Sequence, residues 1–144
     1  MANATLRPFE LRDHPAALAL WQRTEGMGLG SWDEAGPIGQ FLERNPSLSV
    51  VAEADGRLVG AVLCGHDGRR GFLYHLAVDR EFRGQGLGRK LAESCLDRLR
   101  ALGLTRCHIV AYQTNADSRR FWQHLGFRER PELLICSRDL GAEP

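Results

Sequence analysis

The stretch with the clearest chemical potential is residues 78–91, which read VDREFRGQGLGRKL and place Gly84, Gly86 and Gly88 at alternate positions. The residues before it alternate like a strand, and those after it have helical spacing. A helix that begins here presents amides without helical partners, and the helix dipole adds partial positive charge. Glycine also leaves room beside the backbone. We predict that this stretch binds an anion through backbone amides.

Two common phosphate-binding motifs do not fit this stretch. The dinucleotide fingerprint requires G-x-G-x-x-G and an acidic residue about twenty positions further on, where this chain reads GLTR. A P-loop requires Gly-Lys followed by Ser or Thr, but Lys90 stands between Arg89 and Leu91. Arg83, Arg89 and Lys90 add charge that can pair with phosphate oxygens. The alternative without a ligand is a tight turn with solvated arginines.

The preceding elements predict an antiparallel sheet. Residues 48–65 form two β-rich runs around the dipeptide Asp55-Gly56, a strong hairpin signal. Residues 66–71 form a second turn, and residues 72–79 form the next strand. A shorter strand is expected at residues 5–11. This part of the chain therefore predicts an N-terminal antiparallel meander.

The following elements predict a parallel pair. Residues 86–102 have the apolar spacing of an amphipathic helix. Because this helix separates the strand at 105–112 from the strand at 72–79, we expect those two strands to be parallel neighbours. Asn115 is expected to cap a further helix, and residues 132–139 are expected to form a last strand. The fold class is therefore α/β, with a mixed central sheet flanked by helices.

The whole chain has the composition of one domain. Its 144 residues are 43% hydrophobic, which is enough for a single core, so we expect one domain over residues 1–144. The net charge of +1 gives no general attraction to nucleic acid or membranes. The four cysteines lack metal-ligand or disulfide spacing, so no metal is expected. Without a leader or a long apolar run, the expected location is cytoplasmic.

The glycine stretch resembles the signature of a known family. Arg83, Gly86 and Gly88 match the R/Q-x-x-G-x-G/A motif of the GNAT superfamily of N-acetyltransferases. The sequence NADSRRFWQHLGF, residues 115–127, is similar to that family's N-x-x-A-x-x-x-Y-x-x-x-G-F helix. The resemblance covers the chain after residue 5, and DGRRGFLYHLAVDREFRGQG is also similar to the YpeA-like branch.

The resemblance implies a GNAT fold that binds acetyl-CoA as co-substrate. In this family the pantetheine arm lies between two splayed parallel strands, and the acceptor amine attacks the thioester directly. A backbone N–H near Leu76 or Val78 then stabilises the oxyanion. The residues that the resemblance assigns to the cofactor are Leu76, Ala77, Val78, Arg83, Gly84, Gln85, Gly86, Leu87, Gly88, Arg89, Asn115 and Trp122.

The sequence departs from the family pattern at the two proton-transfer positions. Trp122 stands where many members have an acidic tyrosine, and an indole cannot supply that proton. Phe72 stands where some members have a glutamate base. Tyr74 and Tyr112 are the candidate replacements for the tyrosine acid, although Tyr112 fits a core aromatic equally well. By alternation His75 points away from the face of Phe72, which predicts a core histidine.

The acceptor site is expected in the loop GLGSWDEAG. Trp32, Asp33 and Glu34 offer an aromatic wall and carboxylates for a cationic amine, although an anchoring Trp32 and solvated carboxylates are equally compatible. The resemblance thus implies acetyl transfer from acetyl-CoA to a primary amine of a small molecule or peptide, by a monomer or homodimer. The alternative from another class is a non-catalytic module that binds or senses acyl-CoA.

Overall fold

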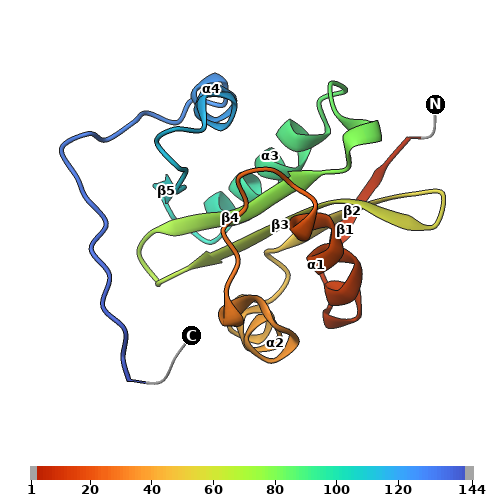
Figure 1. Ribbon diagram of the computed structural model, residues 1–144, viewed down its shortest axis with the longest axis horizontal. Coiled ribbons are helices and arrows are strands. Elements are labelled where there is room, and N and C mark those ends of the chain that lie inside the picture. The colour runs from red at the N-terminus through yellow and green to blue at the C-terminus, as the bar shows by residue number, and fades with distance from the viewer. Residues whose placement is uncertain (1–2, 142–144) are drawn as a thin grey trace.

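The computed structural model describes residues 3–141 and contains a five-stranded sheet flanked by helices (Figure 1). The strands are β1 (Thr5–Pro8), β2 (Val50–Ala54), β3 (Arg57–His66), β4 (Gly71–Val78) and β5 (Cys107–His108), in the order β1-β2-β3-β4-β5. β1 to β4 are antiparallel and β5 is parallel to β4, as predicted. The helices are α1 (His14–Gln22), α2 (Ala35–Arg44), α3 (Leu87–Ala101) and α4 (Ala116–His124), with short 3-10 turns η1 (Leu11–Asp13), η2 (Ser31–Asp33) and η3 (Arg80–Phe82).

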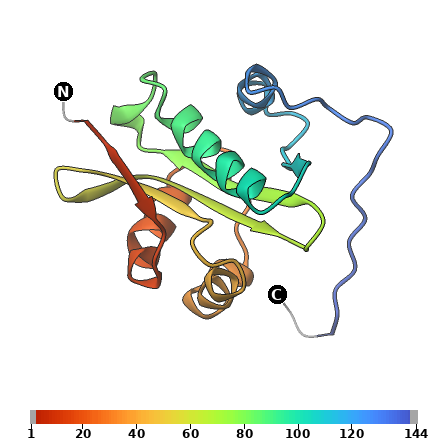
Figure 2. The same cartoon turned by 180° about the vertical axis from the view of Figure 1, so that it is seen from behind.

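The helices cover both faces of the sheet. α1 and α2 lie on one face and α3 on the other, with α4 beside the end of β5 (Figures 1 and 2). Val50 packs in the cluster with α3, whereas its neighbour Val51 packs in the cluster with α1, and both are fully buried. Because both faces are covered, the central strands are apolar at nearly every position.

Local sequence signals explain how these elements begin and end. Asp55 and Gly56 both have positive φ, which fits the predicted two-residue hairpin turn between β2 and β3. Gly103, with φ of 85°, follows the end of α3. Pro8 lies in β1 at the edge of the sheet, where a missing amide is tolerated. Asn115 caps α4, since its side-chain oxygen accepts from the Ser118 amide at 3.1 Å.

Two strand predictions are wrong: one strand is absent, and the other is much shorter than predicted. Residues 132–139 form no strand in the structure, and only Cys107–His108 of the run 105–112 is paired. A strand is stabilised by hydrogen bonds to a neighbour, and an apolar pattern does not supply that neighbour. Cys136 is exposed in the unpaired segment.

Within the part of the chain that the structure describes, the helices are too short or too polar to span a bilayer. The same residues contain no group of three His, Cys, Asp or Glu side chains arranged to hold a metal ion.

Candidate active site

β4 and β5 separate soon after they meet. Their parallel pairing comprises only Gly71 with Cys107 and Phe72 with His108. From Leu73 to Val78, the edge of β4 on that side faces no strand of the described chain. An extended ligand can bind such an edge as an additional strand would, through main-chain hydrogen bonds. The splayed parallel pair is therefore present as predicted.

A β-bulge interrupts β4 beside this opening. The register pairs Leu63 with Tyr74 and Ala61 with Ala77. His75 and Leu76 therefore lie opposite the single residue Val62, and His75 has φ of 54°, in the left-handed region. Such a bulge disrupts the ladder locally and redirects side chains, a feature common next to active sites.

The bulge overturns the predicted orientation of His75. Its ring lies 5.1 Å from the Trp21 ring, and its Nε2 is 2.8 Å from Asp33 Oδ1. His75 therefore lies on the α1 side with Tyr74, whereas Leu76 packs toward the α3 cluster. Simple alternation failed because it does not allow for an extra residue in the strand.

Asp33 is held firmly in place beneath His75. Its side chain is 5% exposed, and Oδ2 accepts from the Gly30 amide at 3.0 Å. Its carbonyl oxygen accepts from His14 Nε2 at 2.8 Å. Because the carboxylate accepts from His75 Nε2, Nδ1 is the basic nitrogen of the neutral His75 ring. Asp33 thus orients a histidine, whereas the sequence suggested an open carboxylate for an acceptor.

The glycine loop combines left-handed backbone with open space. Gly84 and Gly86 have φ of 77° and 80°, and a Cβ at either would meet nothing within 4 Å. At Gly88 a Cβ would lie 3.3 Å from the Phe121 ring, so this glycine permits close approach of α4. The first two glycines therefore provide conformation and room for a ligand, while the third provides packing.

The start of α3 supplies the amides that the sequence predicted. The hydrogen-bond ladder begins with the Lys90 amide, which donates to the Gly86 carbonyl at 3.1 Å. The amides of Leu87, Gly88 and Arg89 precede that bond and so lie outside the helical ladder. The N-cap is Gly86, which has no side chain to cap them. These amides and the helix dipole fit a diphosphate.

Arg83 connects the glycine loop to its surroundings. Its Nε donates to the Val78 carbonyl at 2.9 Å, and its Nη1 is 3.2 Å from Glu25 Oε2. Arg80 Nη2 also contacts Glu25, at 2.7 Å. The Val78 carbonyl is therefore bonded within the chain, whereas the Arg89 side chain is exposed beside the loop.

Comparison with known proteins agrees with this geometry. A family model described as the acetyltransferase (GNAT) family matches residues 10–127. This chain belongs to the GNAT family of acetyltransferases. A curated acetyltransferase of Pectobacterium atrosepticum is 35% identical over 111 residues, which is 76% of this chain and 77% of the relative.

Solved structures share the fold of this GNAT acetyltransferase. Ard1 from Thermoplasma volcanium has a TM-score of 0.77 at 21% identity, covering 87% of this chain and 82% of that chain. The ribosomal-protein-S18-alanine N-acetyltransferase from Escherichia coli has a TM-score of 0.72 at 23% identity, covering 89% and 79%. PaiA N-acetyltransferase from Thermoplasma acidophilum, solved with coenzyme A, has a TM-score of 0.76 at 17% identity, covering 88% and 90%.

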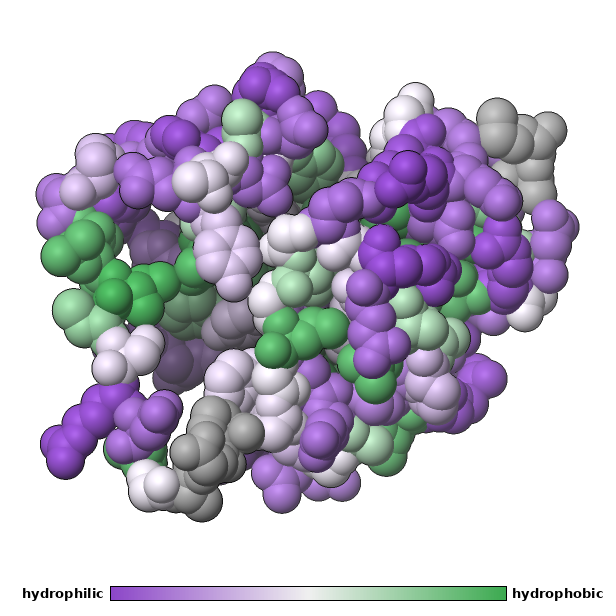
Figure 3. Space-filling model, in the orientation of Figure 1, coloured by the Kyte–Doolittle hydropathy of each residue, from purple (hydrophilic) through white to green (hydrophobic). Residues whose placement is uncertain are grey.

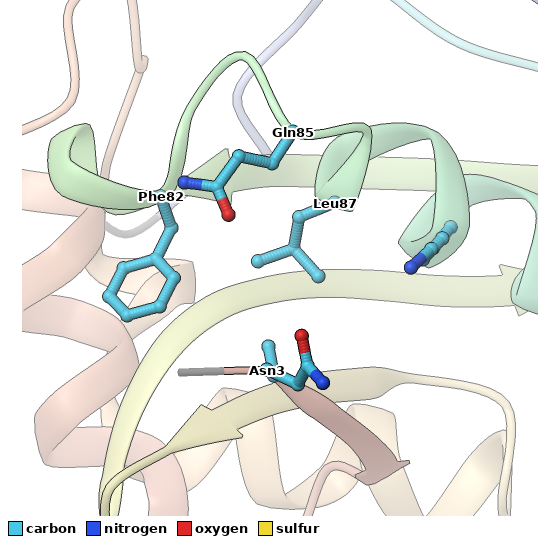
Figure 4. Close-up of a pocket in the computed structure, with 6 residues that line it drawn as sticks. Asn3, Phe82, Gln85 and Leu87 are labelled. Atoms are coloured by element: carbon cyan, nitrogen blue, oxygen red, sulfur yellow. The ribbon is translucent and has the colours of Figure 1, made fainter. Parts of the chain in front are cut away.

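The acetyltransferase has a small hollow on the inner side of the glycine loop (Figure 4). Its lining includes Asn3, Phe82, Gln85 and Leu87, and its volume is about 120 Å³. The Gln85 side chain points toward Phe82 in this hollow (Figure 4). Ligand pockets are usually about 300–1,000 Å³, so this hollow is too small for a nucleotide.

A larger open hollow lies between the end of α1 and the start of α4. It has a volume of about 410 Å³, and its lining includes Glu25, Gly26, Tyr112 and Asn115. A Cβ at Gly26 would lie 2.7 Å from Asn115 Nδ2, so the loop after α1 passes directly against the α4 cap. Asn115 therefore caps α4 and also borders this hollow.

The two candidate tyrosines occupy different surroundings. Tyr74 lies 6.0 Å from the Phe41 ring and 6.0 Å from the Phe72 ring, and burial raises the pKa of its phenol above the ordinary value. Tyr112 is 60% exposed and lies against Gly28, where a Cβ would be 2.5 Å from the hydroxyl. The phenol of Tyr74 thus stays protonated at neutral pH, as a proton donor must.

The remaining predicted residues separate into core and surface. Trp122 is 9% exposed, with its ring 4.9 Å from Phe121 and 5.1 Å from Phe127, which favours packing over cofactor contact. Trp32 is 57% exposed and lies over Gly30. Glu34 is exposed at the start of α2. Packing around α4 buries Trp122, whereas Trp32 and Glu34 lie on the surface before and at the start of α2.

Proposed function

We propose that this acetyltransferase moves the acetyl group of acetyl-CoA directly to a primary amine, within a ternary complex. One observation carries the proposal: the open edge of β4 leads without interruption to the glycine loop and the free amides at the start of α3. The edge suits an extended pantetheine arm and the amides suit a diphosphate. Neighbouring parts of the chain can therefore bind both the pantetheine arm and the diphosphate of one elongated ligand.

The residues of the loop fit this ligand. Gly84 and Gly86 leave open space beside their Cα atoms, so a diphosphate can approach the backbone. The exposed side chain of Arg89 can add charge next to those amides. Acetyl-CoA, when bound, supplies an acetyl group activated as a thioester.

The bulge in β4 supports the proposed stabilisation of the oxyanion that forms during acetyl transfer. We assign the oxyanion to a backbone N–H group near Leu76 or Val78. The bulge takes His75 and Leu76 out of regular pairing with β3, and no strand of the described chain pairs with the other edge of β4 from Leu73 to Val78. Removing one such donor from an enzyme typically costs about 2.7–4 kcal/mol of transition-state stabilisation. A new N–C bond replaces the C–S bond, and positioning of the amine supplies much of the rate.

The His75–Asp33 pair suits the role of base. Asp33 holds Nε2 at 2.8 Å, which leaves Nδ1 to accept the proton that the amine loses, directly or through one water. Histidine changes charge near neutral pH, as this role requires. The protonated phenol of Tyr74, on the same side of β4, can supply a proton to the departing thiolate.

The acceptor that best matches this machinery is an amine of low pKa. An α-amine is neutral in about a tenth of molecules at pH 7, whereas a lysine amine is neutral in about one of a few thousand. The E. coli relative is by name an N-acetyltransferase of an alanine in a ribosomal protein. We therefore propose α-amines of peptides or small molecules as acceptors.

A panel of amines tests this function. The purified protein is incubated with acetyl-CoA and α-amino peptides, lysine peptides or small amines, and released thiol is measured. We expect turnover with α-amines above the rate of spontaneous hydrolysis. Tight binding of acetyl-CoA with no thiol release from any acceptor would favour the sensing module over the enzyme.

A further inference from the structure

Four aromatic rings form a row across the face of the sheet on which α2 lies. The Phe41 ring of α2 lies 6.0 Å from the Tyr74 ring, which is stacked on the Phe72 ring of the same strand at 6.0 Å. The Phe72 ring in turn lies 5.5 Å from the His108 ring of β5. Because Phe72 and His108 are paired in the register of β4 and β5, their side chains share one face. The row therefore leads from the neighbour of His75 toward the start of β4.

This row is open to solvent at the start of β4. Tyr74 is 40% exposed, and Phe72 and His108 are half-buried. In Figure 1 neither α1 nor α2 lies in front of β5 and the first residues of β4. Figure 3 shows a hollow at this place, between the main body and the segment after α4, with hydrophilic surface at its floor. The rings thus belong to a surface that a second molecule can reach.

Positive charge gathers at the far end of the row. Arg70 and Arg106 directly precede β4 and β5, where the Gly71 amide donates to the Arg106 carbonyl at 2.9 Å. By alternation both arginine side chains share the face of His108. Burial lowers the pKa of His108 below its ordinary value, and the next causes are the positive charges of three arginines, Arg70, Arg106 and Arg130. The three guanidinium groups therefore lie near this ring.

The protein itself neutralises these charges only in part. Arg130 is paired with Glu132 at 2.9 Å, but no ion pair of the described residues involves Arg70 or Arg106, and both are exposed. The carboxylate of Asp67, in the preceding turn, accepts from two backbone amides of that turn at 2.8 Å each. A molecule that brings its own carboxylate therefore meets unpaired positive charge here.

We propose that this surface binds the first residues of an acceptor peptide and selects an acidic side chain at about its fifth residue. The inference rests on the proposed function, because it places the acceptor amine beside His75. From His75 back to Arg70 the chain covers roughly 15 Å, and an extended peptide needs about five residues to span that length. The residues between lie over the rings of Tyr74 and Phe72, which favour apolar side chains. The acidic side chain then reaches Arg70 and Arg106, so the acceptor is an acidic peptide N-terminus.

Two matched peptides test this surface. They share apolar first residues and differ only at the fifth residue, which is Asp in one and Arg, which adds no acceptor amine, in the other. Binding is measured with CoA present, by fluorescence anisotropy of a dye at the peptide C-terminus, and acetylation is measured as kcat/KM. We expect the Asp peptide to be favoured about 10-fold in both, and less at high salt because exposed charges are screened. Equal binding of the two peptides would overturn the proposal.

Charge reversal shows whether these arginines make the selection. Substitution of both Arg70 and Arg106 by Glu should invert the preference between the two peptides. The matched control is Arg100→Glu, at an exposed arginine of α3 on the other face of the sheet, and it should keep the wild-type preference.

The two measurements separate this inference from the proposed function. Selective binding without acetylation of either peptide would support the docking surface and reject the proposed function. Acetylation of both peptides with equal kcat/KM would support the function and reject the docking surface. If the double variant lost affinity for a single-stranded oligonucleotide but kept its preference between the peptides, the arginines would serve nucleic acid and the proposal would fail.

Discussion

At the scale of single residues, Gly86 joins two requirements in one position: left-handed backbone and open space in front of the first amides of α3. Gly86→Glu places bulk and negative charge where the diphosphate is expected. We predict that affinity for CoA falls by at least about 100-fold, measured by calorimetry, since charge-assisted hydrogen bonds are each worth about 1.5–3 kcal/mol. Binding that survives this change would mean that the site lies elsewhere.

Gly103→Glu is the matched control. Gly103 also has positive φ, and a Cβ there would meet nothing within 4 Å, but this glycine follows the opposite end of α3. Both substitutions carry the same left-handed strain, of about 1–2 kcal/mol. Equal loss of stability with unequal loss of CoA affinity would therefore separate ligand contact from strain.

His75 is the residue whose role separate values of kcat and KM can reveal. If it accepts the amine proton, His75→Asn should slow the chemical step without weakening the binding of acetyl-CoA. Asparagine tolerates the left-handed backbone better than other replacements. We expect kcat to fall by about 10²–10⁴-fold with little change in KM for acetyl-CoA. His124→Gln, on the exposed end of α4, should change neither.

Asp33→Asn tests the orienting contact separately. Asparagine keeps the shape of the side chain but can present an N–H to Nε2, which favours the wrong tautomer of His75. We expect kcat to fall while KM for acetyl-CoA stays close to the wild-type value. A kcat equal to that of wild type would show that the His75–Asp33 contact is structural only.

At the scale of elements, Asp79 attaches the turn before the glycine loop to the rest of the fold. Its carboxylate is 3.0 Å from Arg23 of the segment after α1, 3.2 Å from Arg57 of β3, and 3.0 Å from the Glu81 amide. Burial alone would raise the pKa of Asp79, but these hydrogen bonds outweigh it and lower the pKa below the ordinary value. The folded state therefore stabilises the ionised form of Asp79 relative to the unfolded state.

Asp79→Asn should consequently destabilise the protein in a pH-dependent way. A lowered folded-state pKa contributes stability above the unfolded pKa of about 3.9, and this is lost as pH falls through the folded value. We expect the variant to lose about 1–3 kcal/mol of unfolding free energy at pH 7. The difference from wild type should shrink as pH falls below about 4, measured by urea unfolding. A difference independent of pH would contradict this account.

The same scale shows what the sequence could predict. Asp55-Gly56, Gly103 and Asn115 act through their own backbone or nearest amides, so their roles follow from local rules. The bulge at His75 depends on register across two strands, and the contact with Asp33 depends on how a loop 42 residues away folds. Neither leaves a local signal. The glycine loop was predictable because strand, turn and helix follow one another directly.

At the scale of the whole molecule, the proposed cofactor site follows the side of β4 that β5 leaves unpaired and continues to the start of α3. Both elements belong to the hydrophobic core, because Leu73 of β4 and Leu91 of α3 pack in the same buried cluster as Val59. The proposed acceptor side instead involves the loop between α1 and α2, which carries Asp33. We therefore expect the cofactor site to be more rigid than the acceptor site. Binding of the cofactor should also be easier to detect as an increase in thermal stability.

Thermal unfolding tests whether the whole chain responds to the ligand as this arrangement requires. A ligand at 100 times its Kd stabilises the folded state by about 2.7 kcal/mol. For a chain of this size, 1 kcal/mol raises Tm by about 2–4 °C, so CoA should raise Tm by about 5–10 °C. Pantetheine at the same concentration lacks the nucleotide diphosphate and should raise it far less, because the amides of α3 then have no anion to bind. Equal Tm shifts for the two compounds would show that the glycine loop contributes nothing to CoA binding. An unchanged Tm with millimolar CoA would contradict the proposal that this chain binds CoA.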